Sequence, residues 1–134
     1  MSRRVVTDDE RRVFVLEHTR LLPVPLALEI HMYRADAVSQ VWFETARWLD
    51  DDDAAVPFWS VPWAGGQALA RYVLDHPEVV RGKRVLDFAC GGGLVAIAAA
   101  RAGAQSRSER GRPRDGDEGI GIRRGIGLSS RLGG

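Results

Sequence analysis

The sequence predicts an α/β fold, because one stretch of it follows the strand–turn–helix order of half a βαβ unit. Residues 84–88 are typical of a short buried strand, residues 89–93 of a glycine-rich turn, and residues 94–102 of an alanine-rich helix. Gly103 stands where a glycine commonly ends a helix. A further strand is predicted over residues 26–33, because Leu, Leu, Ile and Met occupy every second position there.

Helix signals account for the rest of the body. Three helices are expected before the glycine turn, over residues 7–20, 37–49 and about 67–75. Thr7 or Asp8 can cap the first of them, with Val13 and Leu16 on its apolar side. The prolines at 23 and 25 should then break this helix. The four aspartates at 50–53 are expected to form a solvated loop and not a metal site, because consecutive side chains point in divergent directions.

Composition and charge exclude several classes of protein. The 134 residues are 45% hydrophobic and 28% charged, with a net charge of +1, so no strong field favours nucleic acid or an anionic membrane. A single cysteine, Cys90, cannot form an internal disulfide. No apolar run approaches the roughly 20 residues that cross a bilayer, and the N-terminus lacks the apolar region of a signal peptide. We therefore expect a cytoplasmic protein without membrane or nucleic-acid partners.

The composition changes after residue 104. All ten aromatic residues precede that point, whereas residues 105–134 hold seven arginines and eight of the fifteen glycines. Such a segment buries too little apolar surface to offset chain entropy, so we predict that it is disordered. An out-of-frame reading of GC-rich DNA would produce this composition. An RNA-binding Gly-Arg tail is the weaker alternative, because the segment neither repeats nor interleaves aromatic residues.

The glycine turn indicates a ligand site. The glycines let the backbone approach a ligand, and the N-terminus of the following helix offers unpaired N–H groups. Gly91-x-Gly93-x-x-Ala96 matches the dinucleotide fingerprint, which alone is a weak signal. Asp87, at the end of the predicted strand, discriminates between ligands. Its carboxylate would oppose a pyrophosphate but suits a cationic group such as an α-ammonium.

The segment from Asp87 to Gly93 is similar to the acidic-x-Gly-x-Gly-x-Gly motif of class I S-adenosylmethionine-dependent methyltransferases, with Ala89 in place of the first glycine. Upstream, Trp63-Ala-Gly-Gly-Gln67-Ala-Leu resembles the protein-lysine methyltransferases of the electron-transfer flavoprotein β-subunit. Their bacterial relatives, often labelled predicted nicotinamide N-methylases, share the pattern. The two motifs together are far more specific than either alone, and the resemblance covers about residues 22–104.

The resemblance implies a Rossmann-like class I domain that transfers a methyl group from S-adenosylmethionine to a nitrogen. The acceptor would be a protein lysine or a small-molecule amine. The cofactor-binding residues it implies are Trp63, Gly65, Gly66, Gln67, Asp87, Ala89, Gly91 and Gly93. The first four would line the methionine end of the cofactor, and the others would hold its amino-acid and ribose portion. It identifies no catalytic residue, metal ligand or oligomeric state.

The C-terminal part departs from the family. A class I methyltransferase needs an acidic residue after its second strand and a further motif after its fourth. Glu109 and Asp115 lie at about the right distance from the turn, but no β-type run precedes either one. The sequence therefore predicts a helical segment at 1–21, a truncated methyltransferase domain at 22–104 and a disordered segment at 105–134.

This organisation predicts a chain that is inactive as given. The uncovered face of strand 84–88 should make it poorly soluble or molten. Two alternatives remain open at this stage. One is a non-catalytic fragment, and the other is an NAD-type dinucleotide-binding domain, which would need an acidic residue about 20 positions past the turn.

Overall fold

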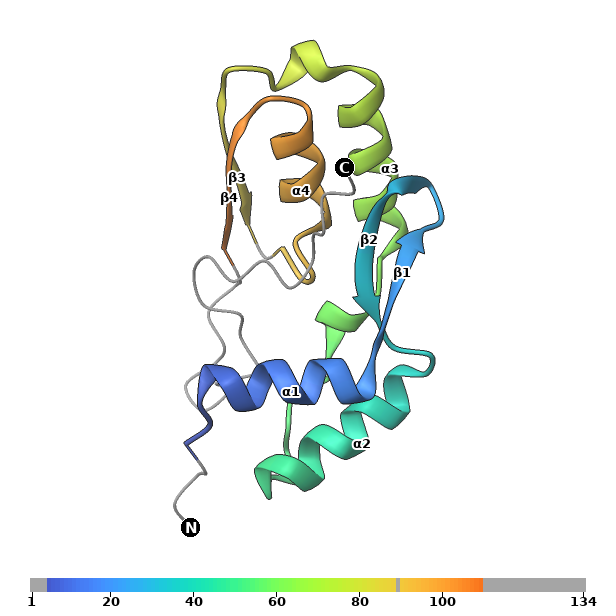
Figure 1. The fold of residues 1–134 in the computed structure, drawn as a ribbon, viewed down its shortest axis with the longest axis vertical. Coiled ribbons are helices and arrows are strands. Elements are labelled where there is room, and N and C mark those ends of the chain that lie inside the picture. The colour runs from blue at the N-terminus through green and yellow to red at the C-terminus, as the bar shows by residue number, and fades with distance from the viewer. Residues whose placement is uncertain (1–4, 89, 110–134) are drawn as a thin grey trace.

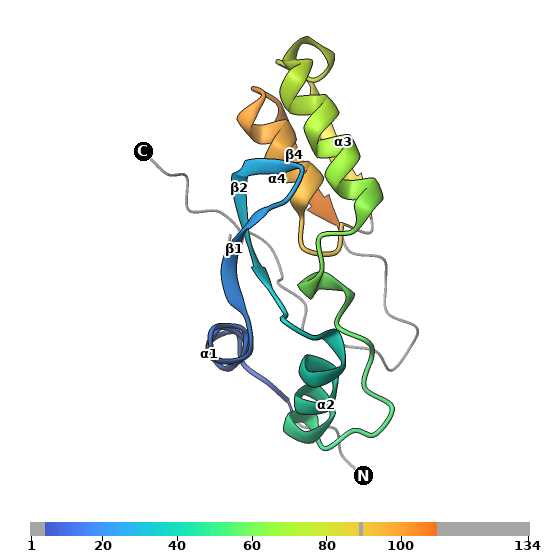
Figure 2. The ribbon, with the colours of Figure 1, turned by 90° about the vertical axis from the view of Figure 1, so that its right-hand side faces the viewer.

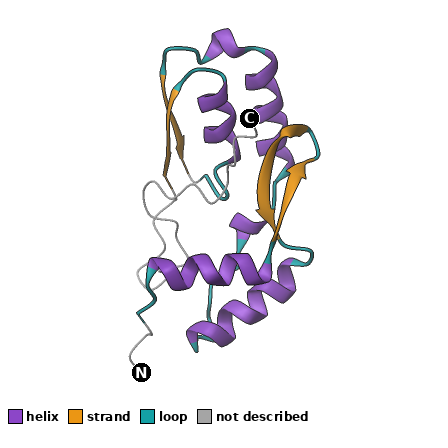
Figure 3. Ribbon diagram, in the orientation of Figure 1, coloured by secondary structure: helices purple, strands orange, loops and turns teal. Residues whose placement is uncertain are grey.

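The computed structural model of the chain describes residues 5–88 and 90–109 (Figure 1). Helices and strands are mixed along the chain (Figure 3), which confirms the predicted α/β class. The elements are α1 (Asp8–His18), β1 (Arg20–Val24), β2 (Ala27–Arg34), α2 (Val38–Leu49), the 3₁₀ turn η1 (Phe58–Ser60), α3 (Ala64–Asp75), the 3₁₀ turn η2 (Pro77–Val79), β3 (Arg84–Phe88), α4 (Leu94–Arg101) and β4 (Gln105–Glu109). Among these described helices, none is long and apolar enough to cross a membrane.

The predicted strand, turn and helix are present as β3, the glycine turn and α4, and β4 completes the βαβ unit. β4 pairs with β3 in parallel, in a register that places Arg84 opposite Gln105 and Phe88 opposite Glu109. Gly103 adopts a φ of 93° directly after α4, which turns the chain back along β3. The backbone N–H of Gln105 then donates to the carbonyl of Lys83 at 2.9 Å, and the pairing begins.

The prediction of disorder from residue 105 onward is therefore wrong for residues 105–109. The segment Gln-Ser-Arg-Ser-Glu has no apolar alternation to signal a strand. Its pairing depends on backbone hydrogen bonds to β3, which composition does not encode. The remainder of the predicted disordered segment, residues 110–134, lies outside the described residues.

The hairpin of β1 and β2 was only half predicted. β2 matches the strand expected over 26–33, but its buried residues are Ala27, Ile30 and Met32, and Leu28 is exposed. β1 pairs with it antiparallel although it contains Pro23. Proline is tolerated in an edge strand because its missing N–H faces away from the partner, and the register is irregular next to it.

Helix α1 begins with the predicted cap. The hydroxyl of Thr7 accepts from the backbone N–H of Glu10, and the Glu10 carboxylate accepts from the backbone N–H of Thr7 at 2.8 Å. This reciprocal pair is a capping box. The predicted apolar side is wrong, because Phe14 and Val15 are the buried residues and Val13 and Leu16 are half exposed.

The buried residues form two clusters. The β1–β2 hairpin runs from α1 and α2 at one end to α3 and α4 at the other (Figure 2). The larger cluster lies between β2, α3 and α4 and contains Val24, Ala27, Ile30, Met32, Ala70, Val73, Val80, Leu94, Ala98, Ala99 and Ala102. The smaller lies between α1 and α2 around Phe14 and Val41, with Trp48 and Trp59 packed against it. The glycine turn lies at the N-terminus of α4, next to the larger cluster.

One face of the β3–β4 pair is uncovered in the part of the chain that the structure describes. Val85 packs against the larger cluster, on the side of α4. The alternate residues Leu86 and Phe88 are 55% and 70% exposed. The expectation that Leu86 and Phe88 are buried in the strand is therefore wrong, whereas the expected uncovered face is present. Parallel strands are normally covered on both faces. This face therefore carries apolar side chains of the kind found in a protein interior, although they are exposed to solvent.

Candidate functional site

Two glycines of the turn are required by the backbone. Gly91 has a φ of 52° and Gly93 a φ of 81°, both in the left-handed region that favours glycine. The N–H of Gly93 donates to the carbonyl of Cys90 at 2.8 Å, which closes the turn, and Gly93 is the N-cap of α4. The two glycines of the predicted motif thus shape the loop that leads from β3 into α4.

The middle glycine, Gly92, is required by packing. A Cβ at this position would lie 2.2 Å from Cε of Met32 and 2.8 Å from the carbonyl oxygen of Trp59. The turn therefore rests directly on β2 and on η1, without room for a side chain. Sequence reasoning did not select Gly92, because its neighbours already accounted for the motif. The sequence did offer one signal for Gly92, namely that it is a glycine at a position where the motif does not require one.

An exposed pair of aromatic rings borders the turn. Phe58 and Trp63 meet edge to face at 5.7 Å, and the Trp63 indole N–H donates to the Phe58 carbonyl at 3.0 Å. That carbonyl lies 3.9 Å from where a Cβ of Gly91 would be. The rings are 56% and 52% exposed, so large apolar surfaces face solvent beside the glycine turn.

Residues 57–63, which we call the aromatic loop, are held in place by Ser60. The Ser60 side chain is fully buried, and its hydroxyl donates to the Pro57 carbonyl at 2.7 Å. Its own carbonyl accepts from the backbone N–H of Ala35, at the end of β2, at 3.0 Å. The loop is therefore anchored to the hairpin.

Helix α3 brings Gly65 and Gly66 to the same place. Trp63 is its N-cap, and no side chain caps the first turn. A Cβ at Gly66 would lie 3.9 Å from Cδ2 of Leu94, the first residue of α4, whereas a Cβ at Gly65 would meet nothing within 4 Å. Neither packing among the described residues nor a positive φ requires glycine at 65. The two predicted motifs therefore adjoin, with an open surface at Gly65.

Gln67 uses both ends of its amide within the chain. Its Oε1 accepts from the backbone N–H of Leu26 at 3.1 Å, and its Nε2 donates to the carbonyl of Pro62 at 2.6 Å. The side chain thus ties the β1–β2 turn to the segment that leads into α3. In this structure Gln67 positions the aromatic loop.

Asp87 supplies a negative charge beside the turn. It follows Leu86 on β3 and points to the side of α4, where its Oδ2 accepts from the backbone N–H of Ala96 at 3.0 Å. Burial raises the pKa of Asp87 above its ordinary value, and the hydrogen bond from Ala96 opposes this effect only in part. A half-buried carboxylate whose charge is disfavoured would gain from a cationic ligand. Ala89, also predicted in this site, lies outside the described residues.

The acidic residue sought after a second strand has a counterpart. β4 ends at Glu109, whose Cα pairs with that of Phe88, one position beyond Asp87. The expectation that no strand precedes Glu109 is therefore wrong. Because the strands are parallel, Glu109 and the glycine turn lie at the same edge of the pair. The other candidate, Asp115, lies outside the described residues.

Possible metal-ligating side chains do not gather within the described ranges. No group of three or more His, Cys, Asp or Glu residues there is placed to hold a metal ion. The run at 50–53 follows α2, where Asp50 ends the helix in the left-handed conformation and the Asp51 carboxylate accepts from the backbone N–H of Asp53 at 3.1 Å. These aspartates shape a turn.

Comparison with known proteins bears out the resemblance predicted from the two motifs. The chain is 42% identical over 93 residues to the electron transfer flavoprotein beta subunit lysine methyltransferase of Xenopus laevis. The aligned residues make up 69% of this chain and 37% of that protein. It is 42% identical over 98 residues to the human protein of that name, covering 72% and 36%. A Caenorhabditis elegans homolog is 29% identical over 92 residues, covering 69% and 36%.

The chain thus spans a little over a third of the length of the curated relatives it matches. No protein-family model matches the chain. No solved structure matches it either.

Proposed function

Because this chain is homologous to the electron transfer flavoprotein β-subunit lysine methyltransferases, we propose that it forms the methyl-donor side of a class I methyltransferase. The observation that carries the proposal is the packing of Gly92 against the carbonyl of Trp59, which joins the aromatic loop and the glycine turn into one site. The parallel β3–α4–β4 unit supports a Rossmann-like domain, in which ligands bind at the carboxyl ends of the strands.

The cofactor that this site suits is S-adenosylmethionine, which supplies a methyl group on a positively charged sulfur. Asp87 would pair with the α-ammonium group, because its half-buried carboxylate accepts from the Ala96 N–H and forms no ion pair with another described residue. The exposed ring of Trp63 would lie against the charged methionine end, where an aromatic face attracts a cation. Glu109, by its place at the end of β4, would serve the ribose hydroxyls.

The acceptor we propose is a lysine of a protein, since the relatives are named as lysine methyltransferases. A small-molecule amine is the second candidate. Transfer requires a deprotonated nitrogen held in line with the methyl group. The chain matches only about 37% of its relatives' length. We therefore propose that residues 1–134 alone bind the donor weakly and transfer no methyl group.

An NAD-type domain remains the competing function. β4 and Glu109 satisfy part of its requirement for an acidic residue after a second strand. Asp87 favours the methyl donor, because its carboxylate beside the turn would repel a pyrophosphate but attract an ammonium group.

Asp87→Asn should weaken S-adenosylmethionine binding by about tenfold or more, since a hydrogen bond to a charged group contributes about 1.5–3 kcal/mol. Isothermal titration calorimetry with the intact chain measures this effect. Glu78→Gln is the matched control, because Glu78 is an exposed acid on η2 whose carboxylate lies 3.5 Å from Nδ1 of His76. If the chain bound NADH in preference to S-adenosylmethionine, the dinucleotide function would replace the one proposed.

The same titration has an expected pH dependence. Burial raises the pKa of Asp87 above its ordinary value, and a cation binds the ionised carboxyl better than the neutral one. The affinity for S-adenosylmethionine should therefore fall as the pH is lowered through that raised pKa. This part of the dependence should vanish in Asp87→Asn and persist in Glu78→Gln.

A further inference from the structure

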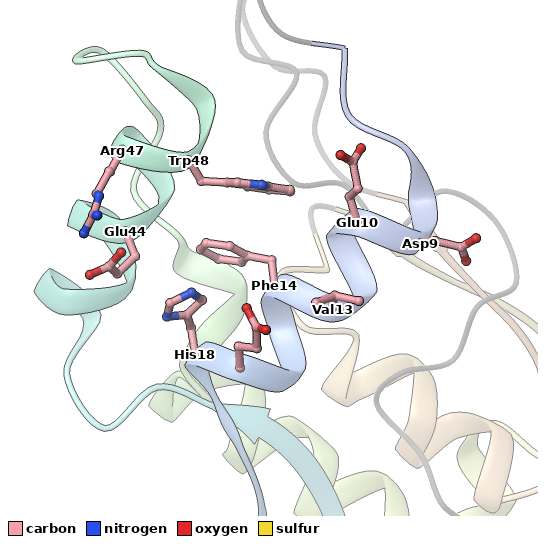
Figure 4. Close-up of a pocket in the computed structure, with 9 residues that line it drawn as sticks. Asp9, Glu10, Val13, Phe14, His18, Glu44, Arg47 and Trp48 are labelled. Atoms are coloured by element: carbon pink, nitrogen blue, oxygen red, sulfur yellow. The ribbon is translucent and has the colours of Figure 1, made fainter.

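A cavity of about 540 Å³ lies between α1 and α2, away from the glycine turn (Figure 4). Residues of both helices line it, and the ones that matter here are Phe14, Trp48, Asp9, Glu17, Glu44 and Arg47. The proposed donor site uses none of these residues. We call this cavity the α1–α2 groove.

Aromatic rings form one wall of the α1–α2 groove. Phe14 stacks on Trp48 with ring centroids 4.6 Å apart and an interplanar angle of 16°. His18 lies against the other side of Phe14 at 4.4 Å. Phe14 is buried in the smaller cluster, so this wall is held in place by the packing of α1 on α2.

Carboxylates surround that wall. Among the described residues, the lining holds four acidic side chains and one arginine, so the charge of these five side chains sums to −3. Glu10 is engaged in the capping box with Thr7. Asp9, Glu17 and Glu44 form no ion pair with another described residue. The groove therefore offers three carboxylates to a cation from outside.

We propose that the α1–α2 groove is a docking site for a lysine-rich segment of a protein partner. The methylene stem of a lysine packs on aromatic surface while its ammonium group reaches a carboxylate, and the groove provides both surfaces side by side. A nucleic acid or an acidic segment would be repelled by the same charges. The proposal rests on the proposed function in one respect: the docked segment belongs to the protein whose lysine accepts the methyl group.

Docking at the α1–α2 groove would serve the reaction by proximity. The groove belongs to the smaller cluster, whereas the glycine turn lies next to the larger one. A partner held at the groove would bring its acceptor region to a high effective concentration near the donor. Such binding needs no contact with the donor site, so the two can be measured independently.

The test measures binding of two fluorescent decapeptides to the intact chain by anisotropy. One alternates Lys and Ala, and the other alternates Glu and Ala. We expect the lysine peptide to bind and the glutamate peptide not to bind. The affinity for the lysine peptide should fall as the salt concentration is raised, because exposed charges are screened. Replacing both Glu17 and Glu44 by lysine should lower the affinity for the lysine peptide by about tenfold or more, since like charges would then face it.

The matched control is Glu78→Lys, which makes the same kind of change on η2. It should leave peptide binding nearly unchanged. Equal loss in the control and in the double variant, or equal binding of the two peptides, would overturn the proposal. S-adenosylmethionine affinity is measured in the same double variant and should stay at the level of the unaltered chain. If the unaltered chain bound the lysine peptide but no S-adenosylmethionine, the proposed function would be contradicted and the docking site would not.

Discussion

Replacing Gly92 with alanine is expected to lower the free energy of unfolding by about 1–3 kcal/mol, the usual cost of forcing an extra group into a packed interior. The added Cβ would lie 2.2 Å from Cε of Met32 and 2.8 Å from the carbonyl oxygen of Trp59. The end of the methionine can move, but the carbonyl is backbone. The residue after it, Ser60, is fixed to Ala35 by a hydrogen bond of 3.0 Å.

Urea unfolding followed by tryptophan fluorescence measures this loss. Gly65→Ala is the matched control, because a Cβ there meets nothing within 4 Å and Gly65 has no positive φ. Alanine forms helix better than glycine, so the control should leave stability unchanged or raise it by up to about 1 kcal/mol. Equal stability of the two variants would mean that the turn does not rest on the aromatic loop as the structure has it.

The uncovered face of β3 should make the chain associate with itself. Leu86 and Phe88 are 55% and 70% exposed, and burying such a side chain completely contributes about 1.5–3 kcal/mol. Each strand of this two-stranded sheet also has an outer edge, whose unpaired backbone groups can pair with another chain. We expect the intact chain to form oligomers of increasing size as its concentration rises, measured by sedimentation velocity.

Replacing Leu86 and Phe88 together by threonine should suppress this association while leaving the unfolding midpoint nearly unchanged, because threonine suits a strand and little buried surface is lost. The matched control replaces Leu26 and Leu28 by threonine. Leu26 lies just before β2 and is 53% exposed, and Leu28 lies on β2 and is 65% exposed. Association that survives in the β3 variant, or that the control reduces equally, would show that another surface is responsible.

The elements that sequence reasoning found were those with local signals. Strand β3, the turn at Gly91 and Gly93, and helix α4 follow one another within twenty residues and were predicted nearly to their ends. Strand β4 was missed because its residues are polar and its order depends on pairing with β3 and on the turn at Gly103. The buried side of α1 was missed because apolar residues lie on both sides of that helix.

The candidate site shows the same division. Trp63 donates to the Phe58 carbonyl beside the glycine turn, and Gly66 faces Leu94 at the start of α4. The cofactor contacts that the resemblance implies for these residues stay a prediction. The contacts of Gln67 and Gly92 could not be predicted, because they depend on residues far away in the sequence. The hydrogen bond between Gln67 and Leu26 and the close approach of Gly92 to Met32 form only after the hairpin has folded against α3 and α4.

The aromatic loop and the glycine turn should form one site for S-adenosylmethionine. The most direct test is an NMR titration of the ¹⁵N-labelled chain with that cofactor. We predict shifts of the Trp63 indole N–H and of the Gly91 and Gly93 amides. The indole N–H of Trp42, which donates to the Ala54 carbonyl at 2.6 Å, serves as the internal reference and should not move. Shifts confined to Trp42 or Trp48 would show that the cofactor does not bind at the aromatic loop and the glycine turn. The same pattern of shifts with NADH at lower concentration would show that this site prefers a dinucleotide.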